Sequence, residues 1–167
     1  MLQPNLNAIK QHLLSQGIEA EIQKETNQLC ILLKIADREY PLFIRIYEGE
    51  ELLQLLSFLP CNTKTSTLAD TARLLHLLNK EIDIPGFGMD ESADVVFYRC
   101  MIPIKNKIID ESLFNSYLNA SQVVCQSFSP VIAAVAYGAI SYENVLAKAK
   151  ENSGQSLAQS FIQKGKK

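Results

Sequence analysis

The stretch Leu29-Cys30-Ile31-Leu32-Leu33-Lys34-Ile35 decides the fold, together with its neighbour Leu42-Phe43-Ile44-Arg45-Ile46-Tyr47. In both stretches apolar residues recur at every second position, which is the side-chain period of a β-strand. Asp37-Arg38-Glu39 lies between them and is short enough for a hairpin turn. A weaker strand precedes them, with one face formed by Ile18, Ala20 and Ile22. The pattern predicts an antiparallel meander.

Helical periodicity surrounds this meander. Apolar residues spaced for one helix face occur before it, at Leu2, Leu6, Ile9 and Leu13, and Gly17 then predicts the helix end. A second helix is predicted from Leu68 to Ile82. Thr67 is its candidate cap and Asp70 completes a pattern close to a capping box.

The remaining elements complete an α+β pattern. Residues 87–89 and 95–102 predict a strand pair around an Asp-rich turn. Residues 52–59 fit either a helix or a strand, and we interpret them as a strand. A third helix is predicted around Leu113 to Phe128, after which Pro130 is expected to begin a new short helix through Tyr137. Ser141 is expected to cap a final helix.

These elements predict an antiparallel sheet flanked by helices. Their order is helix, three or four strands, helix, two strands and helix, with extra helices at the C-terminal end. We expect one α+β domain over residues 1–150 and a polar, basic tail over residues 151–167. The chain has 167 residues, and one domain of that length buries enough apolar surface to hold without disulfides or metals.

Charge and composition indicate an ordinary soluble chain. The net charge is −2, which gives nucleic-acid binding little support. Residues 148–167 contain five lysines and one glutamate, so the rest of the chain is acidic. This basic segment either binds an anionic partner or is a solvated terminus.

The cysteines and the apolar runs predict a cytoplasmic protein. The four cysteines are widely spaced without a C-x-x-C pair, and we expect them to be reduced. The first residues lack the charged start and apolar stretch of a secretory signal. No apolar run is long enough for a membrane span, so we expect no membrane insertion.

Few residues suggest chemistry. Asp90, Glu91 and Asp94 could hold a divalent cation, although Asp-rich hairpin turns are common for backbone reasons. His76 could pair with Cys100 or Cys125 only if the fold brought them together. With two histidines and no zinc spacing, we expect no catalytic residues, no metal site and no cofactor. The chain is expected not to be an enzyme.

Two surfaces are candidates for protein binding. On the strand over residues 42–47, one face suffices for the core and the other offers Phe43, Arg45 and Tyr47 to an extended client, with the groove beside the first helix. The alternative is that helices cover this face. On the second helix, Leu77 points away from the core stripe with Leu74 at its edge, and this patch predicts a homodimer interface unless Leu77 is a scattered surface leucine.

The element order and three stretches resemble the type III secretion chaperone-like fold, including its YbjN-like branch. The stretches are Leu74-Leu75-His76-Leu77-Leu78-Asn79-Lys80, Phe87-Gly88-Met89-Asp90-Glu91 and Val95-Val96-Phe97-Tyr98-Arg99. The resemblance covers about residues 1–130. It implies a small acidic dimer that holds an extended segment of a client protein, or, for the YbjN-like branch, a regulator. It implies no catalytic residues.

We therefore expect a non-catalytic protein-binding module, a cytoplasmic chaperone or adaptor with a protein or peptide client. The alternative is a YbjN-like regulatory protein that acts through complexes with folded partners. Binding of a peptide-length fragment would favour the first over the second.

Overall fold

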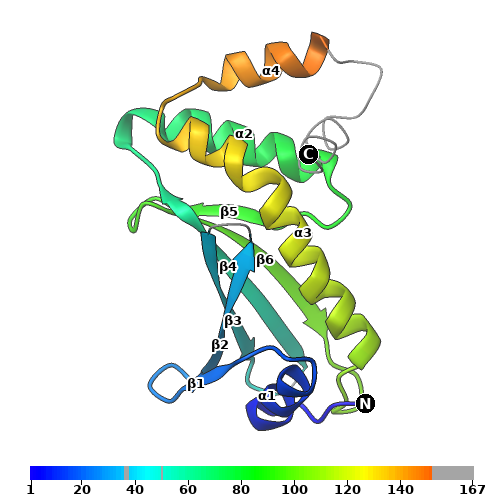
Figure 1. The fold of residues 1–167 in the computed structure, drawn as a ribbon. Coiled ribbons are helices and arrows are strands. Elements are labelled where there is room, and N and C mark those ends of the chain that lie inside the picture. Colours follow the sequence, from blue (N-terminus) through cyan, green and yellow to red (C-terminus); the bar gives the residue numbers. More distant parts are fainter. Residues whose placement is uncertain (36–37, 50, 152–167) are drawn as a thin grey trace. The chain divides into compact units, whose positions relative to one another are not determined.

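A computed structural model describes residues 1–35, 38–49 and 51–151. Figure 1 shows the elements in sequence colours. The helices are α1 (Leu6–Ser15), a short 3₁₀ turn η1 (Thr65–Thr67), α2 (Leu68–Glu81), α3 (Glu111–Ala136) and α4 (Tyr142–Glu151). The strands are β1 (Glu21–Gln23), β2 (Gln28–Ile35), β3 (Arg38–Ile46), β4 (Leu52–Asn62), β5 (Phe87–Asp90) and β6 (Val95–Pro103). Apart from Glu151, the predicted basic tail lies outside the described residues.

The strands form a six-stranded antiparallel sheet in the order β1-β2-β3-β4-β6-β5, which confirms the α+β fold class. The interpretation of residues 52–59 as a strand is also confirmed, because they lie within β4. The chain divides into two compact units. Unit 1 contains residues 1–58 and 99–122, and unit 2 contains residues 59–98 and 123–151 of the described chain.

In unit 1 the alternation of the meander separates an inner face from an outer face. The inner face carries Leu29, Ile31, Leu42 and Ile44, whose side chains are buried. The register pairs Leu29 with Ile44 and Ile31 with Leu42, so these apolar side chains stack across β2 and β3. The intervening residues of both strands form the outer face, and the period predicted this division.

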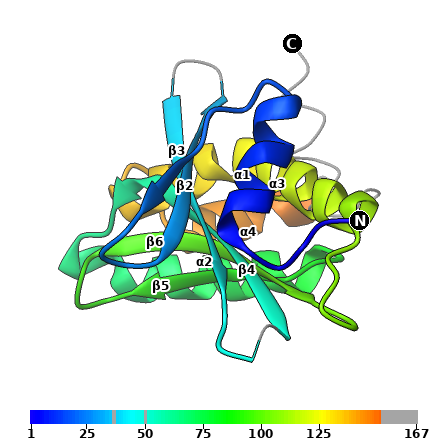
Figure 2. The ribbon, with the colours of Figure 1, turned by 90° about the horizontal axis from the view of Figure 1, so that it is seen from below.

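Two helices of unit 1 lie against the inner face. Figures 1 and 2 show α1 beside β1 and β2. The His12 ring of α1 meets Phe114 of α3 edge-on at 5.8 Å, and its Nε2 lies 2.9 Å from Asn115 Oδ1. Cys100, an inner residue of β6, has its Sγ 3.7 Å from Ser121 Oγ of α3. Both helices therefore cover the face that the sequence assigned to the core.

The weak strand predicted from Ile18 is shorter than expected. The Ile18 N–H donates to the Leu13 carbonyl at 2.9 Å and so belongs to the end of α1. Gly17 makes this turn possible with a φ of +78°. The chain joins the sheet only at Glu21, and β1 therefore pairs with just the first residues of β2.

In unit 2, α2 packs beside β5 and the Asn79 side chain joins them. Its Oδ1 accepts from the N–H groups of Gly86 at 3.1 Å and Phe87 at 2.9 Å. Its Nδ2–H donates to the Phe87 carbonyl at 2.9 Å. A single amide thus fixes where the loop after α2 becomes β5.

The expected break at Pro130 is wrong, since α3 continues through it to Ala136. Proline in a helix interior removes one hydrogen bond and costs about 3 kcal/mol. Buried side chains surround it on both sides, including Phe128, Ile132 and Val135, while Pro130 itself is exposed. Continuing the helix keeps these apolar groups in the core, which outweighs the lost bond.

Of the two helix caps predicted for α2 and α4, the one at Ser141 is confirmed and the one at Thr67 is not. Ser141 caps α4, because its Oγ accepts from the Asn144 N–H at 3.2 Å. Thr67 occupies the cap position of α2, but its hydroxyl donates 2.7 Å to the Ala136 carbonyl instead. Asp70 accepts from the Tyr142 N–H at 2.9 Å and is therefore not part of a capping box. None of the helices within the described ranges is long and apolar enough to cross a bilayer.

Candidate functional site

The outer face of the sheet in unit 1 is the candidate site. It carries the side chains that alternate with the inner face, including Phe43 and Arg45 of β3. The helices of unit 1 lie against the inner face, so the alternative in which helices make Phe43 and Tyr47 core does not apply to the described residues of this unit. Phe43 and Tyr47 are half-buried, and Arg45 is exposed.

Phe43, Arg45 and Tyr47 are held in defined positions. The Phe43 ring meets the Phe58 ring of β4 edge-on at a centroid distance of 5.8 Å. Arg45 Cζ lies 5.0 Å from the centroid of the Tyr47 ring, a cation–π arrangement. The Tyr47 hydroxyl donates to Gln54 Oε1 at 2.8 Å. These contacts order two rings and one cation before any partner arrives.

The same face exposes large apolar side chains. Leu32 on β2 is 53% exposed, Leu52 on β4 is 41% exposed and Met101 on β6 is 37% exposed. Leu56 and Phe58, which lie on β4 and on the same face, are half-buried. Isolated surface leucines need no explanation, but exposed apolar residues on three strands of one face favour a protein-binding surface.

A groove beside α1 lies next to one of the predicted residues. Its volume is about 520 Å³, and it is lined by the start of α1 together with Ile22, Ile46 and Tyr47. Asn5 caps α1 by accepting from the Ala8 N–H at 2.8 Å and also lines this groove. The groove is present where we predicted it, and Tyr47 lines it, but Phe43 and Arg45 do not.

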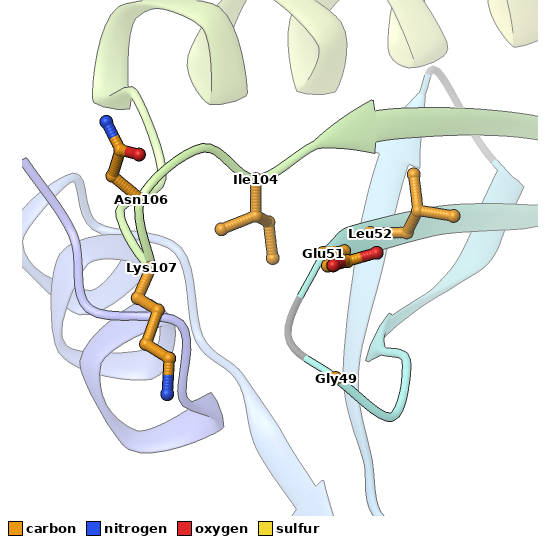
Figure 3. Close-up of a pocket in the computed structure, with 6 residues that line it drawn as sticks. All are labelled: Gly49, Glu51, Leu52, Ile104, Asn106 and Lys107. Carbon is orange, nitrogen blue, oxygen red and sulfur yellow. The ribbon is translucent and has the colours of Figure 1, made fainter.

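Figure 3 shows a second pocket of about 530 Å³, formed where two turns of unit 1 meet. Ile104 and Leu52 line its apolar part, and the Ile104 N–H donates to the Glu51 carbonyl at 2.8 Å. The Lys107 side chain points away from Glu51 in this view. The lining therefore combines one acidic, one basic and two apolar side chains with Gly49 and Asn106.

A third cleft, of about 780 Å³, lies beside β1. The segment from Gly17 to Gln23 lines one part, and Cys30, Leu32 and Lys34 of β2 line another. Burial raises the pKa of the Cys30 thiol, and the negative charge of Glu21 raises it further. A raised pKa makes this thiol a poor nucleophile at neutral pH.

The predicted dimer patch on α2 divides into two different environments. Leu74 is fully buried within the chain, so it belongs to the core and not to the edge of a surface patch. Leu77 is half-buried. Part of the polar side of α2 contacts α4: Arg73 Nη2 lies 2.8 Å from Glu143 Oε1, and its Cζ lies 4.0 Å from the Tyr142 ring centroid. The dimer prediction therefore rests on Leu77.

The residues that the sequence offered for chemistry lie in different surroundings. Asp90 Oδ1 accepts from the Ser92 hydroxyl at 2.6 Å and from the N–H groups of Ser92 and Ala93, which lowers the pKa of this carboxyl. The acidic cluster is thus organised as a turn. His76 is exposed, whereas Cys125 is completely buried. Within the described ranges, no group of three or more His, Cys, Asp or Glu side chains is placed to hold a metal ion.

Sequence reasoning missed two features of this site. Gln54 is buried and orients Tyr47, and the signal for it was a lone amide within a leucine-rich strand. The open side of β2 next to the third cleft was also missed. No sequence signal marked it, because the pattern predicted a strand from Ile18, whereas β1 has three residues and β2 has eight.

The chain was compared with known protein families. Residues 5–134 match the model of the YbjN family, which is described as "Putative bacterial sensory transduction regulator". No curated protein sequence matches the chain. The match spans the whole of β1 to β6 and most of α3.

Proposed function

Because this chain belongs to the YbjN family, we propose that it is a non-catalytic regulatory protein that acts by binding another protein through the outer face of unit 1. The observation that carries the proposal is the set of exposed apolar side chains on β2, β4 and β6 of that face, together with the ordered Arg45–Tyr47 pair. Aromatic rings and an arginine at the centre of an apolar surface are typical of sites that dominate binding energy.

The partner that suits this face is a segment with apolar residues and a carboxylate. Phe43, Tyr47 and their neighbours offer apolar area at little entropic cost because the Phe58 and Gln54 contacts already restrict both rings. Arg45 offers a guanidinium that can pair with a carboxylate in two parallel hydrogen bonds. The net charge of −2 gives no general attraction for nucleic acid.

The absence of catalysis is part of the proposal. Two observations support it: the Cys30 thiol has a raised pKa, and the Asp90 carboxylate is held by hydrogen bonds within its turn. Support for a regulator over a secretion chaperone comes from the family match alone. A regulator should bind a folded partner, whereas a chaperone should bind an isolated segment of its client as tightly as the whole client.

The test compares two variants in affinity purification from the native host, with quantitative identification of what co-purifies. Leu52→Ser with Arg45→Ser changes the outer face, and both side chains are exposed, so the fold should hold. Leu14→Ser is the matched control, because Leu14 on α1 is 42% exposed and lies on a helix. We expect at least one partner to be lost from the face variant and retained by the control. A partner set that is the same for wild type and both variants would refute this site.

We also propose that the protein is a homodimer through Leu77. The half-buried leucine lies on α2 away from the core residue Leu74, and burial against a two-fold copy is the commonest use of such a patch. Light scattering should give about twice the chain mass. Leu77→Asp should lower that mass without changing the far-UV circular dichroism. A monomer at high micromolar concentration would contradict the dimer, and unfolding of the variant would show that Leu77 is core.

A further inference from the structure

One side of β2 has no neighbouring strand along much of its length. β1 pairs with β2 from Glu21↔Cys30 to Gln23↔Gln28, whereas β2 continues to Ile35. No other described strand pairs with residues 31–35 on that side, since β1 is the edge strand next to β2. Every second residue of an antiparallel strand directs its N–H and C=O groups to a given neighbour. This open edge, residues 31–35, therefore presents backbone donors and acceptors to the outside.

The end of α1 keeps the edge open. The Ile18 N–H is bonded to the Leu13 carbonyl, so this backbone group closes the end of α1 and is not bonded to β2. Extending the β1 register backwards would place Ala20 and Glu19 opposite residues 31 and 32, but these residues are not part of a strand. They form a wall of the cleft of about 780 Å³ instead.

The cleft has one apolar side and one acidic side. Ala20 is buried and Ile18 is half-buried, and the neighbouring Ile22 of β1 pairs with the inner residue Leu29. Glu19 and Glu21 are exposed, and Glu21 pairs with the outer residue Cys30. Side chains of a strand alternate between its two faces. A strand placed here would therefore direct one set of side chains toward apolar groups and the other toward carboxylates.

The charge near the edge is negative. Lys34 lies directly opposite Glu39 in the β2–β3 register, so these two charges offset each other. Glu19 and Glu21 remain, and both are exposed. Glu21 lies directly opposite Cys30 in the β1–β2 register, and both residues line the cleft. A second copy of this chain would bring its own glutamates to the same place, which disfavours pairing of two such edges.

We propose that the open edge of β2 binds an extended segment of a partner protein in which apolar and basic residues alternate. The segment adds a strand beside residues 31–35, with its backbone bonded to β2, its apolar side chains toward Ala20 and Ile18, and its basic side chains toward Glu19 and Glu21. Strand addition of this kind takes its affinity from main-chain bonds and its specificity from alternate side chains. The inference rests on the proposed protein-binding function and adds a second contact to it.

The probe is a short fluorescent peptide that alternates valine and lysine, titrated onto the full chain and followed by anisotropy. Two comparison peptides separate the two contributions. One alternates valine and glutamate, and the other is the valine–lysine peptide with alternate amides N-methylated. We expect saturable binding of the first peptide and none of the other two. Hydrogen exchange should slow at alternate amides of residues 31–35 when the first peptide binds.

Protein variants test the position. Glu21→Lys should weaken peptide binding about three- to tenfold, the effect of one close charge contact. Glu25→Lys is the matched control, because it is an exposed glutamate in the turn after β1 that does not line the cleft. We expect it to leave binding unchanged.

Several results would overturn the proposal. Equal weakening by both lysine variants would show unspecific attraction, and binding of the N-methylated peptide would show that β2 does not supply main-chain bonds. Cross-linking of β2 to β2 in a dimer would identify a second copy as the occupant. The proposed function fails separately: its partner depends on Leu52 and Arg45 in affinity purification, and neither residue lies on the open edge or lines its cleft.

Discussion

Asn79→Ala should be among the most destabilising polar substitutions in unit 2. Its side chain makes three hydrogen bonds to the backbone of Gly86 and Phe87, at 2.9 to 3.1 Å. Each such bond contributes about 1 kcal/mol net, so their loss should cost about 3 kcal/mol. Phe87 is buried, which makes replacement of its lost partners by water difficult. A loss of this size should lower Tm by roughly 6–12 °C in a chain of this length.

The assay is urea unfolding followed by far-UV circular dichroism, with two comparison variants. Asn79→Asp keeps the acceptor for two N–H groups and loses the donor to the Phe87 carbonyl, so it should cost less than the alanine variant. Asn119→Ala removes an exposed asparagine from α3 and should change stability by less than about 0.5 kcal/mol. If Asn79→Ala costs no more than Asn119→Ala, or if Asn79→Asp costs as much as Asn79→Ala, the assigned role of this amide is wrong.

Three further predictions use local geometry of unit 2. Thr71 Oγ1 is buried without a hydrogen-bond partner in the described residues, so Thr71→Val should stabilise the chain by about 1 kcal/mol in urea unfolding, and destabilisation would contradict this. A Cβ on Gly88 would lie 2.5 Å from the Phe97 ring, so Gly88→Ala should cost about 1–3 kcal/mol, and the cost should largely disappear in a Phe97→Ala background. Hydrogen bonds from Ser92 lower the pKa of Asp90 in the folded chain. These bonds therefore stabilise the fold fully at pH values above the pKa of an unfolded aspartate. The stabilisation is lost as the pH falls through the lower pKa of the folded state. An NMR titration should show the Asp90 midpoint rising in Ser92→Ala, and an unchanged midpoint would refute the cause.

Local patterns predicted most of the sheet because one physical rule governs it. Residues such as Leu42 and Ile44 alternate with Phe43 and Arg45, and the structure buries the first pair completely while leaving Arg45 exposed. The strand ambiguity at residues 52–59 was also resolved correctly, since Leu53 and Leu55 are buried on the inner face of β4. Burial of every second side chain specifies both the strand and its orientation.

The wrong predictions depend on contacts between distant residues. Pro130 is a strong local signal for a helix start, but the core contacts of Phe128 and Ile132 keep α3 continuous. Asp70 has the right spacing for a capping box, yet it bonds Tyr142, which follows it by 72 residues. Sequence spacing gives no information on such partners, so these local rules were overridden.

In the candidate site too, local patterns predicted some features, whereas others depend on contacts between distant residues. The outward direction of Phe43, Arg45 and Tyr47 follows from the strand period, whereas the groove beside α1 that Tyr47 lines depends on where the helix lies. The sequence pattern placed Leu74 at the edge of a surface patch because it assigned only one narrow stripe of α2 to the core. The structure buries it beside Leu75 and Leu78, which means that the core stripe of α2 is wider than the pattern indicated.

The open edge of β2 has a second physical consequence. An unpaired strand edge is a liability, because it pairs with other chains unless charges or covering segments prevent this. Here Leu32 is exposed on the edge segment, and the charged residues around it are Lys34, Glu19 and Glu21. Two copies that met edge to edge would place glutamates near glutamates, so the same carboxylates that select a basic segment oppose self-association. Glu19→Gln with Glu21→Gln should therefore both weaken binding of the valine–lysine peptide and increase light scattering of the protein alone. If scattering stays unchanged while the peptide is lost, the acids select the partner without protecting the edge.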